Sequence, residues 1–425
     1  MMRSTFGITG SVLLIIFRSL ISLCFITCLI RISFNLKKDQ KNRPHDPHDP
    51  KRKRDKFLKK GCKKFVCSEK SRIFALDMTS HASHRNSAPG EVFEFFKPNV
   101  MMTFKEDFEK IPYEKSPISI EEQVQKLKSR GLIIDDEVLA SKYLTNISYY
   151  RLRAYTYPFQ DNSDPEKHHE FLRKDINFKD IIDLYCFDRR LRFLVFNALE
   201  KVEVALRAKI TQRYSEATND SHWYMDESLF KDDAYLKDGK SEYKYNALME
   251  DIEDEVDRSE EEFIKHYYRR YSEPDMPPSW MALEVVSFGS LSRLYELLVK
   301  DDQKKAVAKE LGLNKVDILE NWMHAFSNLR NCCAHHSRIW NRRFVVNMQL
   351  PTNADYTFLD RNTIASTKRN KLFAYLCCIK YILDIVSPDN DFLANLQTII
   401  SQGGPLLSLK DMGFPENWKH LGVWK

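Results

Sequence analysis

One long amphipathic segment constrains the fold of this 425-residue chain more than any other feature. From about Phe178 to Ala217, apolar residues recur at intervals of three and four, which places their side chains on one face of an α-helix. The positions on this face are Ile181, Leu184, Tyr185, Phe187, Leu191, Leu194, Val195, Ala198, Val202, Leu206 and Ile210. A helix of about ten turns with one apolar face predicts a bundle in which other helices pack around it.

The rest of the chain beyond residue 101 also has helical patterns, so we predict an all-α fold: a central helical bundle with accessory helices. The sequence Ser119-Ile-Glu-Glu122 is typical of a capping box that opens a helix, and Gly131 would end that helix. No glycine-rich phosphate loop occurs. Further helices are expected at about 135–146, 147–159, 243–271, 277–298, from Asp317 onward, at 371–386 and at 391–400, with a strand or extended loop at 345–361.

The net charge of +6 is unevenly distributed along the chain. Residues 1–100 contain 20 Lys and Arg against 8 Asp and Glu, which leaves 46 against 52 for residues 101–425. The part that is expected to fold is therefore mildly acidic, and its overall charge does not favour nucleic-acid binding. Any contact with RNA must come from a local basic patch.

The N-terminal region predicts an anchor and a tether. Residues 8–30 are long and apolar enough to cross a membrane, which makes residues 1–34 a candidate transmembrane anchor. Residues 35–100 are basic and turn-rich, and we interpret them as a disordered linker. The excess of cations after the apolar run places the domain at 101–425 in the cytoplasm, with a single pass through the inner membrane. The alternative is that residues 1–100 are an over-extended gene start before Met101 and Met102, which leaves a cytoplasmic protein without an anchor.

The cysteines indicate a reduced protein without a zinc site. Nine are present, and adjacent pairs such as Cys332-Cys333 and Cys377-Cys378 cannot easily bridge each other. The domain has no two cysteines separated by two to four residues, the spacing that is typical of zinc sites, so we expect no metal site and no cofactor.

The most chemically informative segment is residues 329–342, Leu-Arg-Asn-Cys-Cys-Ala-His-His-Ser-Arg-Ile-Trp-Asn-Arg. Cleavage of RNA needs proton transfer to and from oxygen and a positive charge beside the phosphorus. Histidine suits proton transfer near neutral pH, and the arginine fork suits phosphate oxygens. We expect Arg330 to stabilise the phosphate, Asn331 to orient it or the imidazole, and His335 to transfer protons. On a continuous helix His324, Asn331, His335, Arg338 and Arg342 would share one side.

The same segment allows other interpretations. Arg330, His335 and Arg338 could make ordinary helix-packing contacts, and His336 also satisfies the spacing. Since acid and base roles normally need two histidines, one motif per chain suggests that two chains meet at a shared site. The pairs Glu203/Arg207 and Asp188/Arg192 are four residues apart, and we expect buried ion pairs rather than catalytic groups.

The segment Arg330-Asn-Cys-Cys-Ala-His335 resembles the Arg-Asn-x-x-Ala-His signature of the Abi-like (abortive infection) family, within the HEPN superfamily of helical RNases. Other segments resemble this family in the same order along the chain. They are Ser148–Tyr155, Phe187–Arg192 with Glu203 and Arg207, Pro278–Trp280 with Ser287–Gly289, and Met412–Trp418. The resemblance extends from about Ile118 to the C-terminus, and residues 1–100 have no counterpart in it.

The resemblance implies a metal-independent endoribonuclease of a phage-defence or toxin–antitoxin system, with a HEPN-like bundle and a site completed by a homodimer. It implies catalytic roles for Arg330, Asn331 and His335, and an antitoxin of protein or RNA as a further partner. Substrate contacts are expected from Arg338, His336, Arg342 and Arg151. The alternative is a non-catalytic RNA- or protein-binding helical module, membrane-tethered if residues 8–30 form an anchor, in which Tyr149, Tyr150, Arg151 and Arg153 would contact RNA.

Overall fold

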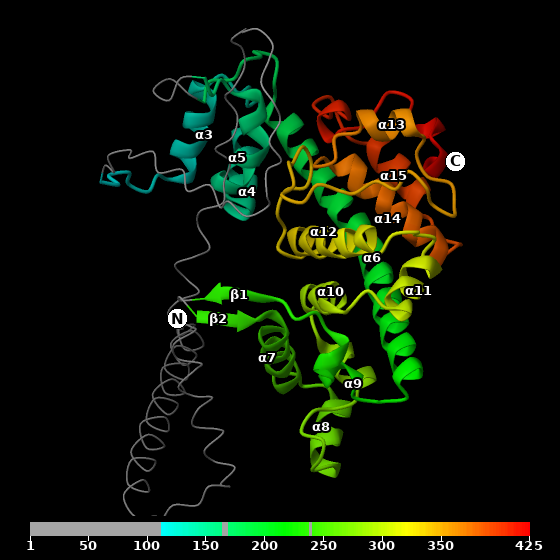
Figure 1. Ribbon diagram of the computed structural model, residues 1–425. Coiled ribbons are helices and arrows are strands. Elements are labelled where there is room, and N and C mark those ends of the chain that lie inside the picture. Colours follow the sequence, from blue (N-terminus) through cyan, green and yellow to red (C-terminus); the bar gives the residue numbers. More distant parts are fainter. Residues whose placement is uncertain (1–111, 164–168, 238–239) are drawn as a thin grey trace, which may run out of the picture. The chain divides into compact units, whose positions relative to one another are not determined.

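A helix of 41 residues, α6 (Phe178–Thr218), runs through the middle of the described part of the chain (Figure 1). A capping box between Asn177 and Asp180 closes its N-terminus, and Asn219 ends it in the left-handed conformation with φ at 50°. The predicted apolar face is confirmed, because its members are buried or half-buried. The helix therefore carries the core to which the other helices attach.

The computed structural model describes residues 112–163, 169–237 and 240–425, which belong to the compact unit Lys110–Lys425. The predicted anchor at 1–34, its apolar run at 8–30 and the predicted linker at 35–100 lie outside the described residues. Within the ranges that are described, no helix is both long and apolar enough to cross a membrane.

Helices from both ends of the unit pack against α6. On the N-terminal side, α3 (Ile120–Ser129) contacts α4 (Glu137–Ile147), which in turn contacts α5 (Tyr149–Thr156), and α5 contacts α6. Figure 1 shows α12 crossing α6 near its middle. The remaining helices in contact with α6 are α9 (Ser279–Val285), α10 (Phe288–Leu297), α11 (Asp302–Glu310), α12 (Val316–Ala334), α14 (Leu372–Val386) and α15 (Phe392–Ser401).

The capping signals in the sequence are confirmed at the first helices. Ser119 and Glu122 form the predicted capping box of α3, and Asp136 caps α4 by accepting a hydrogen bond from the backbone N–H of Leu139 at 2.8 Å. Ser148, with φ at 71°, divides α4 from α5, and a 3-10 turn at Tyr157–Phe159 follows α5 at Pro158.

Two of the predicted helix boundaries are wrong. The expected helix at 243–271 is two helices, α7 (Lys244–Asp257) and α8 (Glu262–Arg270), because the chain turns at Arg258–Glu261, where the Ser259 hydroxyl accepts a hydrogen bond from Glu261 N at 3.3 Å. The expected helix at 277–298 is likewise two helices, α9 (Ser279–Val285) and α10 (Phe288–Leu297), because the side chain of Ser287 caps α10 through Ser290 N at 3.1 Å.

The described residues also contain one antiparallel hairpin that the sequence did not indicate. Strand β1 (Ala234–Lys237) pairs with β2 (Lys240–Tyr243), with Ala234 opposite Tyr243. Residues 345–360 form a loop with several bends and one isolated bridge between Leu313 and Ala354, and α13 (Arg361–Ser366) follows them. The fold is predominantly helical, as predicted, with this hairpin as an addition to the all-α expectation.

Candidate active site at the end of α12

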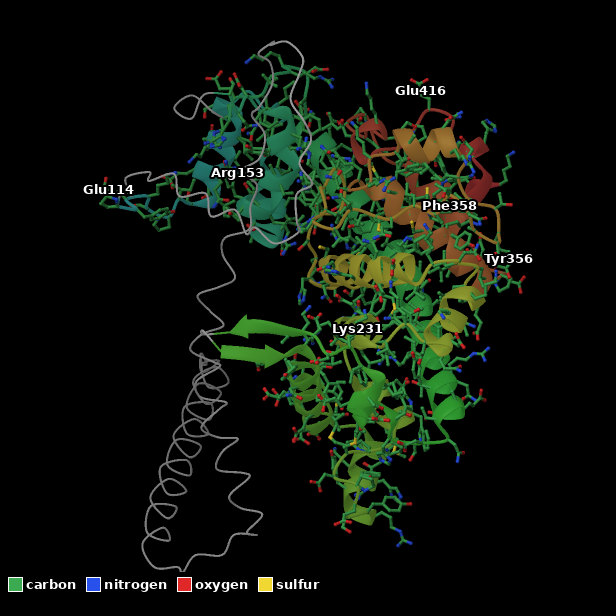
Figure 2. The ribbon with its side chains drawn as sticks, viewed as in Figure 1. Glu114, Arg153, Lys231, Tyr356, Phe358 and Glu416 are labelled. Carbon is green, nitrogen blue, oxygen red and sulfur yellow. The ribbon has the colours of Figure 1, made fainter. Side chains whose placement is uncertain are left out.

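The helix α12 is anchored in the core along most of its length. Trp322, Phe326 and Leu329 are fully buried. The ring centroid of Trp322 lies 5.9 Å from that of Tyr381 on α14 and 6.2 Å from that of Phe358, which is labelled in Figure 2. The exposed positions on α12 include His324, Asn328 and Asn331. A rigid helix therefore leads to the segment with the most distinctive chemistry.

The expectation that one continuous helix carries residues 329–342 is wrong. The helix ends at Ala334, His335 is the C-cap, and His336 adopts the left-handed conformation with φ at 57°. Its N–H donates to Cys333 O at 3.1 Å, and that of Ser337 donates to Cys332 O at 2.8 Å. These bonds form a Schellman motif with His336 at the position that glycine usually occupies. Arg338 and Arg342 therefore lie in a loop rather than on the helix face with Asn331.

A buried carboxylate holds this loop against α6. The side chain of Asp188 is fully buried, and its Oδ1 accepts hydrogen bonds from the backbone N–H groups of Ile339 at 3.2 Å and Trp340 at 2.6 Å. Its Oδ2 accepts from the hydroxyl of Tyr155 at 2.6 Å and pairs with the guanidinium of Arg192. Burial raises the pKa of Asp188, while the Arg192 charge and the donated hydrogen bonds act to lower it. The predicted Asp188–Arg192 ion pair is confirmed, and it fixes where the chain goes after His336.

The two cysteines of the segment are poor candidates for chemistry. Burial raises the pKa of Cys332, and it raises that of Cys333 to about 12. A cysteine reacts as the thiolate, and these thiols stay protonated at neutral pH. The reactive groups at this end of α12 are therefore the two exposed imidazoles and the guanidinium of Arg330.

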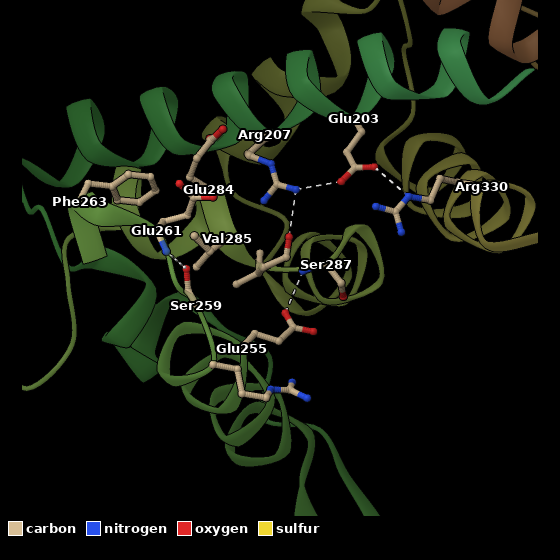
Figure 3. Close-up of a pocket in the computed structure, with 12 residues that line it drawn as sticks. Glu203, Arg207, Glu255, Ser259, Glu261, Phe263, Glu284, Val285, Ser287 and Arg330 are labelled. Carbon is tan, nitrogen blue, oxygen red and sulfur yellow. Dashed lines mark hydrogen bonds and ion pairs between the residues drawn. The ribbon is translucent and has the colours of Figure 1, made fainter. Parts of the chain in front are cut away.

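Arg330 points from α12 toward α6 and lines a pocket of about 710 Å³ (Figure 3). Its Nε lies 3.5 Å from Oε2 of Glu203, whose Oε1 accepts a hydrogen bond from Arg207 Nη2 at 2.9 Å. Arg207 also donates to the backbone carbonyls of Leu283 and Val286, so the predicted Glu203–Arg207 pair is confirmed as buried and joins α6 to α9. Glu203 thereby holds two arginines, and the orientation of Arg330 depends on α6.

The other predicted site residues make contacts within the chain. Asn331 is exposed, and its Oδ1 accepts a hydrogen bond from Arg330 Nη1 at 3.3 Å, so its side chain contacts the arginine rather than an imidazole. Arg151 of α5 donates to the backbone carbonyl of His336 at 2.8 Å, and Arg338 donates to that of Ala154 at 2.8 Å. These two arginines attach the loop to α5. Their roles toward a substrate stay predictions.

The pocket also contains acidic residues that sequence reasoning did not select. Glu255, Glu261 and Glu284 line it together with Glu203, and Glu255 Oε2 accepts a hydrogen bond from Ser287 N at 2.8 Å. Residues 255–287 lie far from α12 in the sequence, and only the fold brings them to the pocket that Arg330 lines. Their spacing in the sequence gives no indication of this proximity. Within the described ranges, no group of three or more His, Cys, Asp or Glu side chains is placed to hold a metal ion.

The buried carboxylate generates a prediction about stability. Replacing it in Asp188→Asn leaves the buried guanidinium of Arg192 without its charge partner, and we expect the free energy of unfolding to fall by about 3–5 kcal/mol. Chemical denaturation measures this change. The matched control is Asp183→Asn on the same helix, where the partner Lys179 is exposed, and the expected change is below about 1 kcal/mol. Equal effects of the two substitutions would contradict this account.

The left-handed residue generates a second prediction. Because a side chain other than glycine costs roughly 1–2 kcal/mol in this conformation, His336→Gly should raise the free energy of unfolding by up to about 1 kcal/mol. The neighbouring Ser337→Gly, at a position without positive φ, should lower it. A loss of stability in His336→Gly, measured by denaturation, would show that the imidazole makes a contact that outweighs the backbone strain.

Comparisons with known proteins identify the region that contains this site. Residues 142–341 match the family described as Abi-like protein, a range that extends from α4 through the Schellman motif to Asn341. The resemblance noted in the segments between 148 and 335 falls within this range, and the segment Met412–Trp418 lies beyond it. No curated protein and no solved structure matches the chain. The match to the Abi-like protein family therefore covers the region from α4 to the loop after α12, and it supports the resemblance noted in the sequence.

Proposed function

We propose that this protein is a metal-independent endoribonuclease of an abortive-infection or toxin–antitoxin system. The observation that carries the proposal is the end of α12, where the exposed imidazole of His335 follows the half-buried guanidinium of Arg330 on a rigid, core-anchored helix. The match to the Abi-like family supports the biological setting. The Asp188 network fixes the loop that follows His335, and α12 before it is packed in the core, which gives the two side chains the pre-organisation that catalysis requires.

The proposed reaction needs only the atoms of RNA and these side chains. An imidazole removes the proton of a 2′-hydroxyl, the freed oxygen attacks the adjacent phosphorus, and the bond from phosphorus to the 5′-oxygen breaks. A second proton donor protonates the departing 5′-oxygen, so that the products end in a 2′,3′-cyclic phosphate and a 5′-hydroxyl. Arg330 binds the phosphate oxygens as negative charge develops on them. Its contact with Glu203 at 3.5 Å aligns the guanidinium before substrate arrives.

His335 is the preferred proton-transfer residue over His336. Both imidazoles are exposed, but the backbone carbonyl of His336 is held by Arg151 and its conformation is the strained one. His335 lies at the C-cap, one turn after Asn331, where its N–H still donates to Asn331 O at 2.9 Å. The variant His336→Gly distinguishes the roles of the two histidines, because it removes the imidazole at position 336 and glycine readily adopts the same backbone conformation.

A homodimer is part of this proposal, because each described chain presents one such site. The helix α6 has an exposed apolar stripe beside Glu203: Phe193, Phe196 and Val204 are 61%, 37% and 52% exposed. Phe196 lies two turns before Glu203 on nearly the same side of the helix. A second copy that covers this stripe would bring its own α12 close to the first and supply the second imidazole.

A second candidate function is binding of RNA without turnover. It is favoured by Tyr150, which is 68% exposed next to Arg151 on α5 and is free to stack on a base. Tyr149 and Arg153 are less available for contacts with RNA. The hydroxyl of Tyr149 accepts a hydrogen bond from Arg130, and Arg153 Nη2 lies 3.2 Å from Nε2 of His169.

The central test is cleavage of RNA by the purified full chain in the presence of EDTA. We expect fragments with 2′,3′-cyclic phosphate ends, and a rate reduced at least about 100-fold in His335→Ala and in Arg330→Ala. The matched control is His324→Ala, an exposed histidine three turns earlier on the same helix, and His336→Gly should also remain active. Binding without cleavage by the unmodified chain would favour the second candidate, and cleavage that survives both alanine substitutions would refute the assignment of the site.

The dimer is tested by the molar mass in solution. The unmodified chain should have about twice its monomer mass of 50.2 kDa by light scattering, because the apolar stripe is covered by a second copy. Phe193→Asp should give the monomer mass and lose cleavage, while Tyr271→Asp, at an exposed tyrosine that ends α8, should change neither. A monomeric and fully active unmodified chain would contradict the shared site.

A further inference from the structure

A concentration of cations lies in the two loops that follow the candidate active site. The loop after α12 contains Arg342 and Arg343, and the loop before α14 contains Lys368, Arg369 and Lys371. Arg343, Lys368 and Arg369 are exposed, and the other two are half-buried. We call these five residues the basic face. They stand out because residues 101–425 as a whole carry more acidic than basic side chains.

Backbone hydrogen bonds hold the two loops side by side. The N–H of Phe344 donates to Asn370 O at 2.9 Å, and that of Met348 donates to Arg369 O at 3.0 Å. The ammonium of Lys371 donates to Asn341 Oδ1 at 2.9 Å, which is a third tie between the loops. The backbone positions that carry the cations are therefore fixed by the fold.

Within the described part of the chain, the five cations of this face have no carboxylate in an ion pair with them. The three lysines of α11 differ from them. Lys304, Lys305 and Lys309 each have a carboxylate oxygen at 3.0 Å or less. Burial lowers the pKa of Lys371, and the charges of Arg343, Lys368 and Arg338 lower it further, with Asp411 acting in the opposite direction. Cations that repel one another at fixed positions are stabilised by an anion that binds across them.

The basic face continues into the candidate active site. Arg342 Nη1 donates to Arg338 O at 3.4 Å. Burial raises the pKa of Cys332 and the positive charge of Arg342 acts in the opposite direction, which places Arg342 beside the last turn of α12. Cys332 precedes His335 by three residues. A linear polyanion that lies along the basic face would lead toward the end of α12, where His335 is the C-cap.

We propose that the basic face binds the phosphate backbone of the RNA substrate on one side of the cleavage point. This inference rests on the proposed function and adds to it the surface along which the substrate lies. The face offers lysine ammonium and arginine guanidinium groups, which contact phosphates irrespective of sequence. It binds single strands electrostatically, and the choice of cleavage site is made elsewhere.

The test uses the His335→Ala chain, which is expected to bind without cutting, and a fluorescent single-stranded RNA of mixed sequence. In this background, Arg343→Gln, Lys368→Gln and Arg369→Gln together remove three exposed cations. Each lost phosphate contact reduces the slope of log K against log salt by about 0.7, so the slope should fall by about 2 and the affinity by about 100-fold at 0.1 M salt. The control combines Lys126→Gln, Arg270→Gln and Lys305→Gln, three exposed cations on α3, α8 and α11, and has the same net charge.

The outcomes separate this inference from the proposed function. If the RNA affinity of the triple variant and of its control falls equally, the basic face is not the binding surface, even where the unmodified chain cuts RNA. If the unmodified chain does not cut but the triple variant alone loses affinity, the nuclease proposal fails and the basic face stands. A third arm replaces the RNA with vesicles that contain phosphatidylserine. Vesicle binding that depends on these three residues, without RNA binding, would overturn the inference in favour of a membrane contact.

Discussion

The carboxylate of Asp188 is the interaction on which the geometry of the candidate site depends. It lies at 0% exposure inside the bundle and receives hydrogen bonds from α5, from α6 itself and from the backbone of the loop after α12. A buried charge is costly unless every lone pair is used, and here four donors use them. Because two of the donors are backbone N–H groups of Ile339 and Trp340, the path of the chain just after the two histidines is set by α6. The ion pair between Glu203 and Arg330 then attaches the other end of the motif to the same helix.

The helical framework could be predicted from the sequence where local signals and burial agree. The face of α6 was predictable because its apolar residues repeat from Ile181 to Ile210, and the capping box at Ser119 marks a helix start through short-range hydrogen bonds. The division of 243–271 into two helices was not predictable in the same way. Its charged residues favour a helix throughout, and the turn at Ser259 depends on how α7 and α8 pack on the rest of the unit.

The candidate site was predictable in its residue types and not in its geometry. The spacing from Arg330 to His335 indicated the chemistry. The predicted helix was too long, because the sequence has no glycine where α12 ends. His336 takes the left-handed position instead. The carboxylate partner of Arg330 is Glu203, which lies far from it in the sequence, and the second loop of the basic face is residues 368–371. Of this face, only Arg342 was selected from the sequence, because the backbone bonds between Phe344 and Asn370 and between Met348 and Arg369 that bring the two loops together exist only in the fold. Long-range pairing of this kind leaves no periodic signal.

The chemistry at the end of α12 depends on a 2′-hydroxyl in the substrate, and this gives the most direct measurement. An RNA oligonucleotide that the protein cuts at one position is compared with the same oligonucleotide carrying a single 2′-deoxy nucleotide on the 5′ side of that bond. The account predicts that the modified oligonucleotide binds equally well and is not cut at this position. If the 2′-deoxy oligonucleotide is cut at the same position and at the same rate as the unmodified one, attack by the 2′-hydroxyl is excluded, and so is the role assigned to His335.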